Sequence, residues 1–105
     1  MSKLREITTT NFEAEVLRSP VPVAVDFFSE QCGPCRILKP ILESLADAIG
    51  DDAKIVAVDV AENERLAIEC GISAVPTIIV YKDGHETRRM VGLAELGELR
   101  VTLGA

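Results

Sequence analysis

Hydrophobic positions along the chain recur at intervals that switch between the spacing of strands and the spacing of helices. Runs rich in valine and alanine or isoleucine occupy residues 21–28 and 54–60, as expected of central strands covered on both faces. Residues 77–91 predict a hairpin of two alternating strands, joined by an Asp-Gly pair that is typical of a tight turn. A shorter stretch over residues 4–7 predicts one further strand near the beginning of the sequence.

Between these strands the apolar residues follow the spacing of helices. Over residues 34–49 they recur three and four positions apart, and Pro34 suits the first turn of a helix. A short helix is predicted over 63–70, where Asn63 fits the N-cap position that precedes the first turn. Leucines at helical spacing predict a last helix over residues 96–103.

The earliest helix is expected to begin near Thr10, because Thr10 and Glu13 stand three positions apart in the pattern of a capping box. The resulting order of elements is β-α-β-α-β-α-β-β-α. Alternation in the first part predicts parallel strands joined by crossover helices, and the hairpin adds an antiparallel edge. We therefore expect an α/β fold with a mixed central sheet flanked by helices on both faces, formed by residues 1–105 as a single domain.

Composition and charge exclude several classes of protein. The 105 residues include 17 acidic and 11 basic side chains, giving a net charge of −6, and the basic residues are scattered. No nucleic-acid partner is expected, because binding to phosphates requires a basic surface. No apolar run is long enough for a signal peptide or a membrane span, so we expect a cytoplasmic protein without a membrane partner. The odd number of cysteines, three, is not typical of a disulfide-stabilised scaffold.

Two of the cysteines form the sequence Cys-Gly-Pro-Cys where the predicted strand 21–28 gives way to the helix 34–49. Unpaired N–H groups and the positive end of the dipole at a helix N-terminus stabilise a thiolate, so the pKa of Cys32 should lie below its ordinary value. Cys35, one turn further along, is expected to be more buried. We interpret Cys32 as the nucleophile that attacks a substrate disulfide and Cys35 as the thiol that resolves the mixed disulfide.

The residues between the two cysteines suit this chemistry. Gly33 lets another backbone approach closely, and Pro34 has a fixed φ angle and no N–H group. A zinc site would need about four ligands, and only Cys70 and His85 remain, far apart in the sequence. A purely structural disulfide across so short a loop would constrain the unfolded chain very little. The motif therefore predicts redox chemistry without a metal.

Asp26 interrupts the apolar strand that precedes the motif. Burying an unpaired carboxylate is costly, so Asp26 is either held by local hydrogen bonds or retained for its chemistry. We favour proton transfer, because Cys35 must lose a proton before it acts as a nucleophile. Pro76, just before the strand that begins at Thr77, either starts an edge strand or turns the chain in the cis form, and its position alone leaves both open.

Taken together, the segments VDFFSEQCGPC, AVPT, KDG and MVG resemble the thioredoxin family over essentially the whole chain. The resemblance implies a thioredoxin fold, with Pro76 in cis beside the cysteines and Asp26 buried behind Cys35. It implies a monomeric protein-disulfide reductase that takes electrons from a thioredoxin reductase, passes them to disulfide-containing proteins and holds no cofactor tightly. The substrate surface that it implies, with the Val75 backbone pairing to an extended segment, consists of Gln31, Gly33, Val75, Pro76 and Gly92.

The chain departs from the family pattern at three positions. Gln31 stands where a tryptophan usually precedes the first active-site cysteine, and Phe28 stands where a second tryptophan is common. Loss of the large ring at position 31 removes apolar contact area, so we expect slower reduction of generic protein disulfides. Ala57 stands where many relatives place a lysine near the buried acid, and without that cation the ionised form of Asp26 is harder to maintain.

Other interpretations remain open from the sequence. A thioredoxin-fold binding or chaperone-type module would use the fold as a docking surface with incidental thiols, which Gln31 favours and the intact Cys-Gly-Pro-Cys opposes. Reduction of glutathione mixed disulfides is less well supported, because such proteins usually carry an aromatic residue where this chain has Gly33 and Pro34. For Cys70, a buried core position and a regulatory thiol are alternatives.

Overall fold

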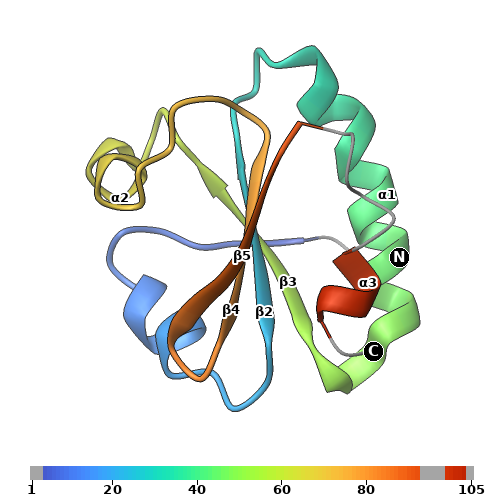
Figure 1. Ribbon diagram of the computed structural model, residues 1–105. Helices are drawn as coiled ribbons and strands as arrows, with labels where there is room; N and C mark the ends of the chain where they lie inside the picture. The colour runs from blue at the N-terminus through green and yellow to red at the C-terminus, as the bar shows by residue number, and fades with distance from the viewer. Residues whose placement is uncertain (1–3, 93–98, 104–105) are drawn as a thin grey trace.

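The computed structural model describes residues 4–92 and 99–103, and five strands of this part form one mixed sheet (Figure 1). The strands are β1 (Arg5–Glu6), β2 (Val23–Phe28), β3 (Lys54–Asp59), β4 (Thr77–Lys82) and β5 (His85–Val91). Their order across the sheet is β1-β3-β2-β4-β5. The first three in this order run parallel, whereas β4 is antiparallel to β2 and β5 is antiparallel to β4. The predicted mixed sheet with an antiparallel edge is confirmed.

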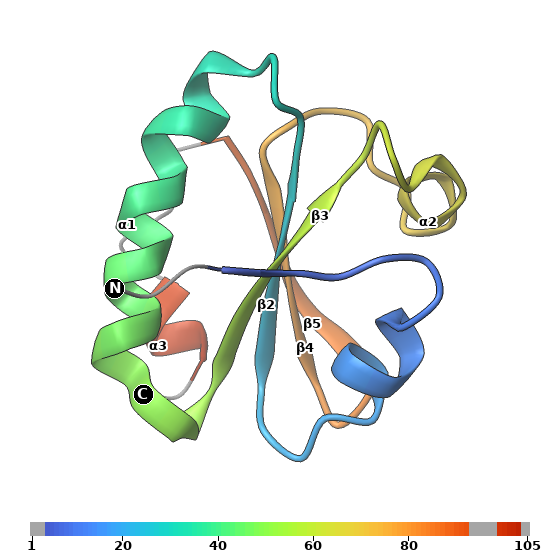
Figure 2. The ribbon, with the colours of Figure 1, turned by 180° about the vertical axis from the view of Figure 1, so that it is seen from behind.

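Helices cover both faces of this sheet, as predicted. They are α1 (Gly33–Ile49), α2 (Glu64–Glu69), α3 (Leu99–Thr102), a π-helical turn η1 (Glu13–Leu17) and a 3₁₀ turn η2 (Gly50–Asp52). The opposite views in Figures 1 and 2 place α1 and α3 on one face and η1 and α2 on the other. Of the last predicted helix, residues 96–98 lie outside the described part. In that part, no helix is long and apolar enough to cross a membrane.

The β4–β5 hairpin brings the end of β5 back to the start of β4. Its turn has positive φ angles at both central residues, 53° at Asp83 and 81° at Gly84, as a tight primed turn requires. The two strands then pair from Lys82 opposite His85 to Thr77 opposite Val91. The segments that precede β4 and follow β5 therefore meet at one end of the sheet.

The first helical segment differs from the prediction. The residue at the N-cap of η1 is Phe12, and no side chain caps this turn, so the predicted capping box of Thr10 and Glu13 is wrong. The side chain of Asn11 takes over the local hydrogen bonding, because its Oδ1 accepts the backbone N–H of Thr8 at 2.8 Å. This bond closes a turn before the helix, and the N-cap of the helix is Phe12 rather than the predicted Thr10.

Asn63 occupies the predicted N-cap position of α2 but its side chain does not cap the helix. Its Oδ1 accepts the backbone N–H of Thr9 at 3.0 Å, and its Nδ2 donates to the carbonyl oxygen of Asp59 at 3.0 Å. Asn63 is buried, so these two bonds satisfy its polar atoms where solvent does not reach. Its role is to connect the loop after β1 to the end of β3.

The strand β2 divides the core, because its alternate side chains point to opposite faces of the sheet. Val25 and Phe27 belong to the apolar cluster that includes residues of η1 and α2. Ala24 belongs to the cluster under α1, and Phe28 packs against that cluster. Asp26 stands two positions from each of these residues and shares their face, so its carboxyl group lies on the α1 side with only 3% of the residue exposed.

Candidate active site

The two motif cysteines lie at the N-terminus of α1 and are joined by a disulfide bond, with a Cα–Cα distance of 5.2 Å. Cys32 is the N-cap residue in an extended conformation, and its Sγ accepts a hydrogen bond from the Cys35 backbone N–H at 3.2 Å. Cys32 is half-buried, whereas Cys35 is only 4% exposed. The Cys32 sulfur is therefore the more accessible one and lies at the positive end of the helix dipole.

The loop before β4 lies beside these cysteines. The Val75–Pro76 peptide bond is cis, so the alternative of a proline that merely starts an edge strand is wrong. The carbonyl oxygen of Val75 is 3.7 Å from the Cys32 Sγ, within reach of a thiol donor when the pair is reduced. The Gly92 N–H donates to the Pro76 carbonyl oxygen at 2.9 Å, which joins the end of β5 to the same place.

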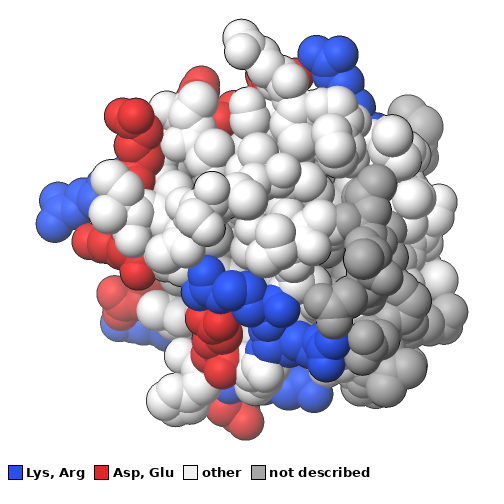
Figure 3. Space-filling model, turned by 45° about the horizontal axis from the view of Figure 1, so that its top comes forward, with Lys and Arg blue, Asp and Glu red and all other residues white. Residues whose placement is uncertain are grey.

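The surface around this junction carries few charges. Gln31, Gly33 and Pro34 are exposed next to Cys32, and the Gln31 N–H donates to the Ser29 Oγ at 3.3 Å. Figure 3 brings this end of the molecule forward and shows a broad area of uncharged residues, with acidic and basic side chains mainly around its border. Such a surface suits contact with the backbone and apolar side chains of another protein.

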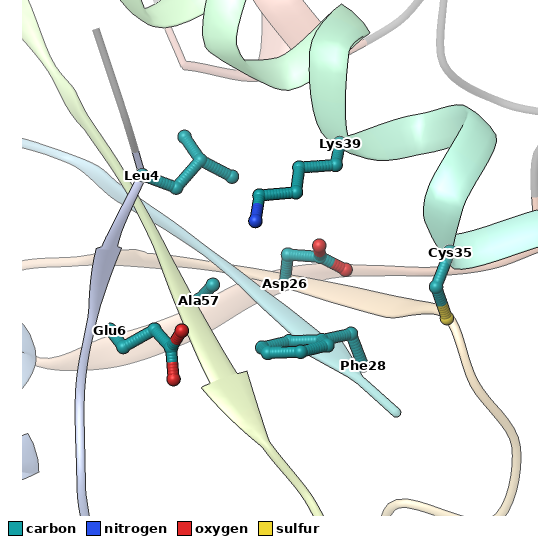
Figure 4. Close-up of a pocket in the computed structure, with 7 residues that line it drawn as sticks. All are labelled: Leu4, Glu6, Asp26, Phe28, Cys35, Lys39 and Ala57. Atoms are coloured by element: carbon teal, nitrogen blue, oxygen red, sulfur yellow. The ribbon is translucent and has the colours of Figure 1, made fainter. Parts of the chain in front are cut away.

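Asp26 lies beneath the cysteines in an environment that favours its neutral form. Burial raises the pKa of Asp26 to about 7, and its Oδ1 has no hydrogen-bond partner. The carboxyl group faces a cavity of about 30 Å³ (Figure 4). This cavity is lined by Leu4, Glu6, Asp26, Phe28, Cys35, Lys39 and Ala57. Asp26 and Cys35 therefore border the same small space.

Two charged residues that line this cavity, Glu6 and Lys39, were not among the expected site residues. Lys39 stands four positions after Cys35 in the sequence, a spacing that puts both on one face of α1. Glu6 pairs with Ala57, which in turn pairs with Asp26 on the neighbouring strand. The helical spacing was visible in the sequence, whereas the position of Glu6 follows only from the strand order.

Cys70, the remaining cysteine, lies away from the motif. Its sulfur is 3.7 Å from the hydroxyl oxygen of Tyr81, and it packs against the cluster on the η1 and α2 face. Over residues 4–92 and 99–103, no three His, Cys, Asp or Glu side chains gather as they would around a metal ion.

Known proteins are similar to this sequence over most of its length. The sequence model of the family Thioredoxin matches residues 3–105. Thioredoxin 1 of Synechococcus elongatus is 38% identical over 103 residues, covering 98% of this chain and 96% of the relative. Thioredoxin 1 of Nostoc sp. is 37% identical with the same coverage of both chains. Thioredoxin of Rickettsia prowazekii is 35% identical over 96 residues, covering 91% of each chain.

The chain therefore belongs to the thioredoxin family. It is a thiol–disulfide oxidoreductase, a protein-disulfide reductase whose redox-active pair is Cys32 and Cys35. Its substrates are disulfide-containing proteins. The family, the fold and the activity implied by the sequence resemblance are confirmed.

Proposed function

We propose that Cys32 is the attacking nucleophile, that Cys35 resolves the mixed disulfide and that Asp26 accepts the proton of Cys35. The observation that carries this assignment is the difference in access between the two sulfurs at one helix N-terminus. Cys32 is half-buried and Cys35 is 4% exposed, so an incoming protein disulfide reaches Cys32 first. Gly33 and Pro34 hold the two sulfurs within one turn of α1.

The reaction begins from the dithiol form. The Cys32 thiolate attacks one sulfur of the substrate disulfide, the substrate S–S bond breaks, and the departing sulfur leaves as a thiolate that takes a proton from solvent. Asp26, as a carboxylate, then takes the proton of Cys35. The Cys35 thiolate attacks the Cys32 Sγ and releases the second substrate sulfur as a thiolate, which is protonated in turn. The substrate gains two electrons, and this chain ends with the Cys32–Cys35 disulfide.

The pKa of Asp26 supports its proton-transfer role. A carboxyl group with a pKa of about 7 changes protonation near neutral pH, where a thiol must be deprotonated during turnover. The cavity shared by Asp26 and Cys35 has room for a water molecule, which can pass a proton between groups that do not touch.

We further propose that the substrate segment lies across Gln31, Gly33, Val75, Pro76 and Gly92. A Cβ atom added at Gly33 would meet no atom within 4 Å beyond its chain neighbours and the nearby backbone of its own helix, so an added side chain would project into the space of a docked partner. Gln31 offers less apolar area than the tryptophan usual in the family. We therefore expect slower reduction of generic protein disulfides than by relatives with tryptophan.

The electron donor that suits this cycle is a thioredoxin reductase, and the compartment is the reducing cytoplasm, where such a pair is returned to the dithiol form. We expect the chain to act as a monomer, because one chain contributes every residue of the proposed site.

Trapping of the mixed disulfide tests these roles. A Cys35→Ser variant should accumulate a disulfide between Cys32 and a substrate protein, and a Cys32→Ser variant should not. Accumulation through Cys35 instead would reverse the assignment. If a variant with both serines kept its biological activity, the protein would act as a binding module with incidental thiols.

The role of Asp26 needs a separate measurement. In an Asp26→Asn variant we expect the resolving step at pH 7 to slow by roughly tenfold or more, since the internal proton acceptor is gone. The rate should also lose its dependence on pH near 7. Unchanged thiol reactivity across neutral pH would leave Asp26 with a structural part only.

A further inference from the structure

Three neighbouring strands place two acids on either side of a small residue. Glu6 on β1 pairs with Ala57 on β3, and Ala57 pairs with Asp26 on β2, so the three side chains lie on the face covered by α1. Neighbouring strands are about 4.8 Å apart, which separates the two acids by roughly twice that distance. Because Ala57 has only a methyl group, the space between the acids is not filled by the strand that separates them.

Lys39 of α1 reaches over this space. Figure 4 shows its side chain extending from the helix toward the region between Leu4 and Asp26, with Glu6 beyond Ala57. Lys39 and Glu6 are both exposed residues, whereas Asp26 is buried, so the two charged residues mark the side from which solvent reaches the cavity.

The cavity continues toward solvent along the same side of α1. A neighbouring cleft of about 210 Å³ shares Glu6, Phe28, Cys35 and Lys39 with it. The inner cavity, about 30 Å³, is lined by Asp26 and has room for a water molecule, and the buried Oδ1 of Asp26 has no hydrogen-bond partner. A water at this place would hydrate the carboxylate and connect it to the cleft.

We propose that this cavity is a water-filled connection between Asp26 and solvent, and that Lys39 and Glu6 beside it set the proton affinity of Asp26 in opposite directions. Its importance for catalysis rests on the proton-transfer role proposed above. When a substrate protein covers the surface around Cys32, the side of α1 near Lys39 remains a route by which Asp26 exchanges its proton.

Lys39 and Glu6 are the charged side chains that line the inner cavity together with Asp26, and Glu30 lines only the outer cleft. From α1 comes the Cys35 sulfur, and from β4 the paired residue is the apolar Ile78. On β3, Asp59 lies further toward the end of the strand, where its carboxylate accepts the Ala61 N–H at 2.9 Å. Arg36 lines the outer cleft, and its guanidinium donates to the Glu30 carbonyl oxygen at 2.9 Å.

The two charges have opposite signs and therefore opposite effects. The ammonium group of Lys39 stabilises the Asp26 carboxylate and lowers the pH at which Asp26 loses its proton. The carboxylate of Glu6 disfavours a second negative charge nearby and raises that pH. The chain thus carries a cation for Asp26 on α1, although position 57 holds alanine.

Titration of the Asp26 carboxyl group by carbon NMR in the oxidised protein tests this proposal, because no thiol titrates in that form at the motif. At low ionic strength, Lys39→Gln should raise the Asp26 midpoint by roughly half a pH unit, and Glu6→Gln should lower it by a similar amount. Lys82→Gln and Glu64→Gln serve as controls that change the net charge equally without touching the cavity. An Asp26→Asn variant assigns the signal.

A third variant tests the water. Ala57→Val adds two methyl groups where the cavity lies, and the displaced water should raise the Asp26 midpoint. The proposal is overturned if Lys39→Gln and Glu6→Gln leave the midpoint where the two controls leave it, or if Ala57→Val does not raise it. Because the titration involves no turnover, it remains informative if Asp26→Asn shows that Asp26 has no part in thiol chemistry.

Discussion

The two cysteine environments of this molecule lie at opposite ends of helices. Cys32 is the N-cap of α1, where the Cys35 N–H points at its sulfur from 3.2 Å. Cys70 is the C-cap of α2, where backbone carbonyl groups are left without helical partners. A thiolate is stabilised by the first surroundings and disfavoured by the second. The same residue type is thus placed in two positions with different chemistry.

The two sulfurs also differ in their neighbours. Cys32 lies beside the cis-proline loop on a surface of few charges, and Asp26 lies beneath the pair. Cys70 packs against the apolar layer on the other face of the sheet, and burial raises the pKa of its thiol. The Arg89 guanidinium donates to the Cys70 carbonyl oxygen at 2.8 Å and helps to hold this turn in place. Cys32 and Cys70 are both half-buried, so the helix end and the neighbouring groups, rather than exposure, distinguish the two cysteines.

Removal of each cysteine in turn should give the largest contrast. We expect Cys32→Ser to lower the rate of insulin reduction to that of the uncatalysed reaction, roughly a thousandfold loss, because the nucleophile is missing. Cys70→Ser should stay within about twofold of the parent rate, since its sulfur touches no reacting atom. Equal losses in the two variants would mean that the two environments do not differ in function.

Asp26→Asn should stabilise the folded protein in a pH-dependent way. Asp26 has a pKa of about 7 when folded against about 3.9 when unfolded, so the folded protein binds the extra proton between these values. Its stability therefore falls as pH rises through this window. Relative to the parent, Asp26→Asn should gain roughly 3 to 4 kcal/mol in unfolding free energy between pH 4 and pH 8.

Urea unfolding of the oxidised protein at both pH values measures this gain. Tyr81→Phe, next to Cys70, is the matched control. Burial raises the pKa of Tyr81 above its ordinary value, so Tyr81 stays neutral at both pH values. Its effect on stability should be the same at pH 4 and pH 8. A gain for Asp26→Asn that does not depend on pH would show that Asp26 is not held neutral by burial.

Alkylation should separate the two environments without any substitution. In the reduced protein at pH 7, iodoacetamide should modify Cys32 roughly a hundredfold faster than Cys70, as judged by mass mapping of the labelled peptides. In urea the two rates should become similar, because both thiols are then exposed and unperturbed. Similar rates in the folded protein would contradict the contrast in thiolate stability.

Gln31→Trp should have a smaller effect that is confined to the Cys32 surface. We expect insulin reduction to rise by a few-fold, about 1 kcal/mol in transition-state stabilisation, because an aromatic ring adds apolar contact with the substrate. The alkylation rate of Cys70 should not change. An unchanged or lower insulin rate would mean that Gln31 does not limit docking.

Much of the fold could be predicted from the sequence where a local pattern agrees with the final packing. The apolar runs of β2 and β3, the helical stripe of α1 and the Asp83-Gly84 turn each specify an element without help from distant residues. The sequence Cys-Gly-Pro-Cys at a strand–helix junction likewise predicts the redox pair. In these segments local preference and tertiary structure favour the same conformation.

Of the helix caps predicted from the sequence, the capping box of Thr10 and Glu13 is replaced by a local bond between Thr8 and Asn11, whereas the cap expected at Asn63 is replaced by contacts between distant segments. The polar atoms of Asn63 bind Thr9 and Asp59 rather than the first turn of α2, and this becomes visible only when β1 and β3 are side by side. Glu6 comes near Asp26 only because β1 and β2 both pair with β3, on either side of Ala57. Local sequence patterns carry no information on the order of the strands across the sheet.

The reduction potential of the Cys32–Cys35 pair tests the assigned chemistry most directly. The Cys70→Ser variant would be equilibrated in defined thiol–disulfide buffers, and the fraction of disulfide would be read from the mass shift after alkylation. We predict a single reversible two-electron couple near about −270 mV, a value taken from other thioredoxins rather than derived from this structure. A couple near about −120 mV, as in strong oxidants, or the absence of any reversible couple would contradict the assignment as a reductant.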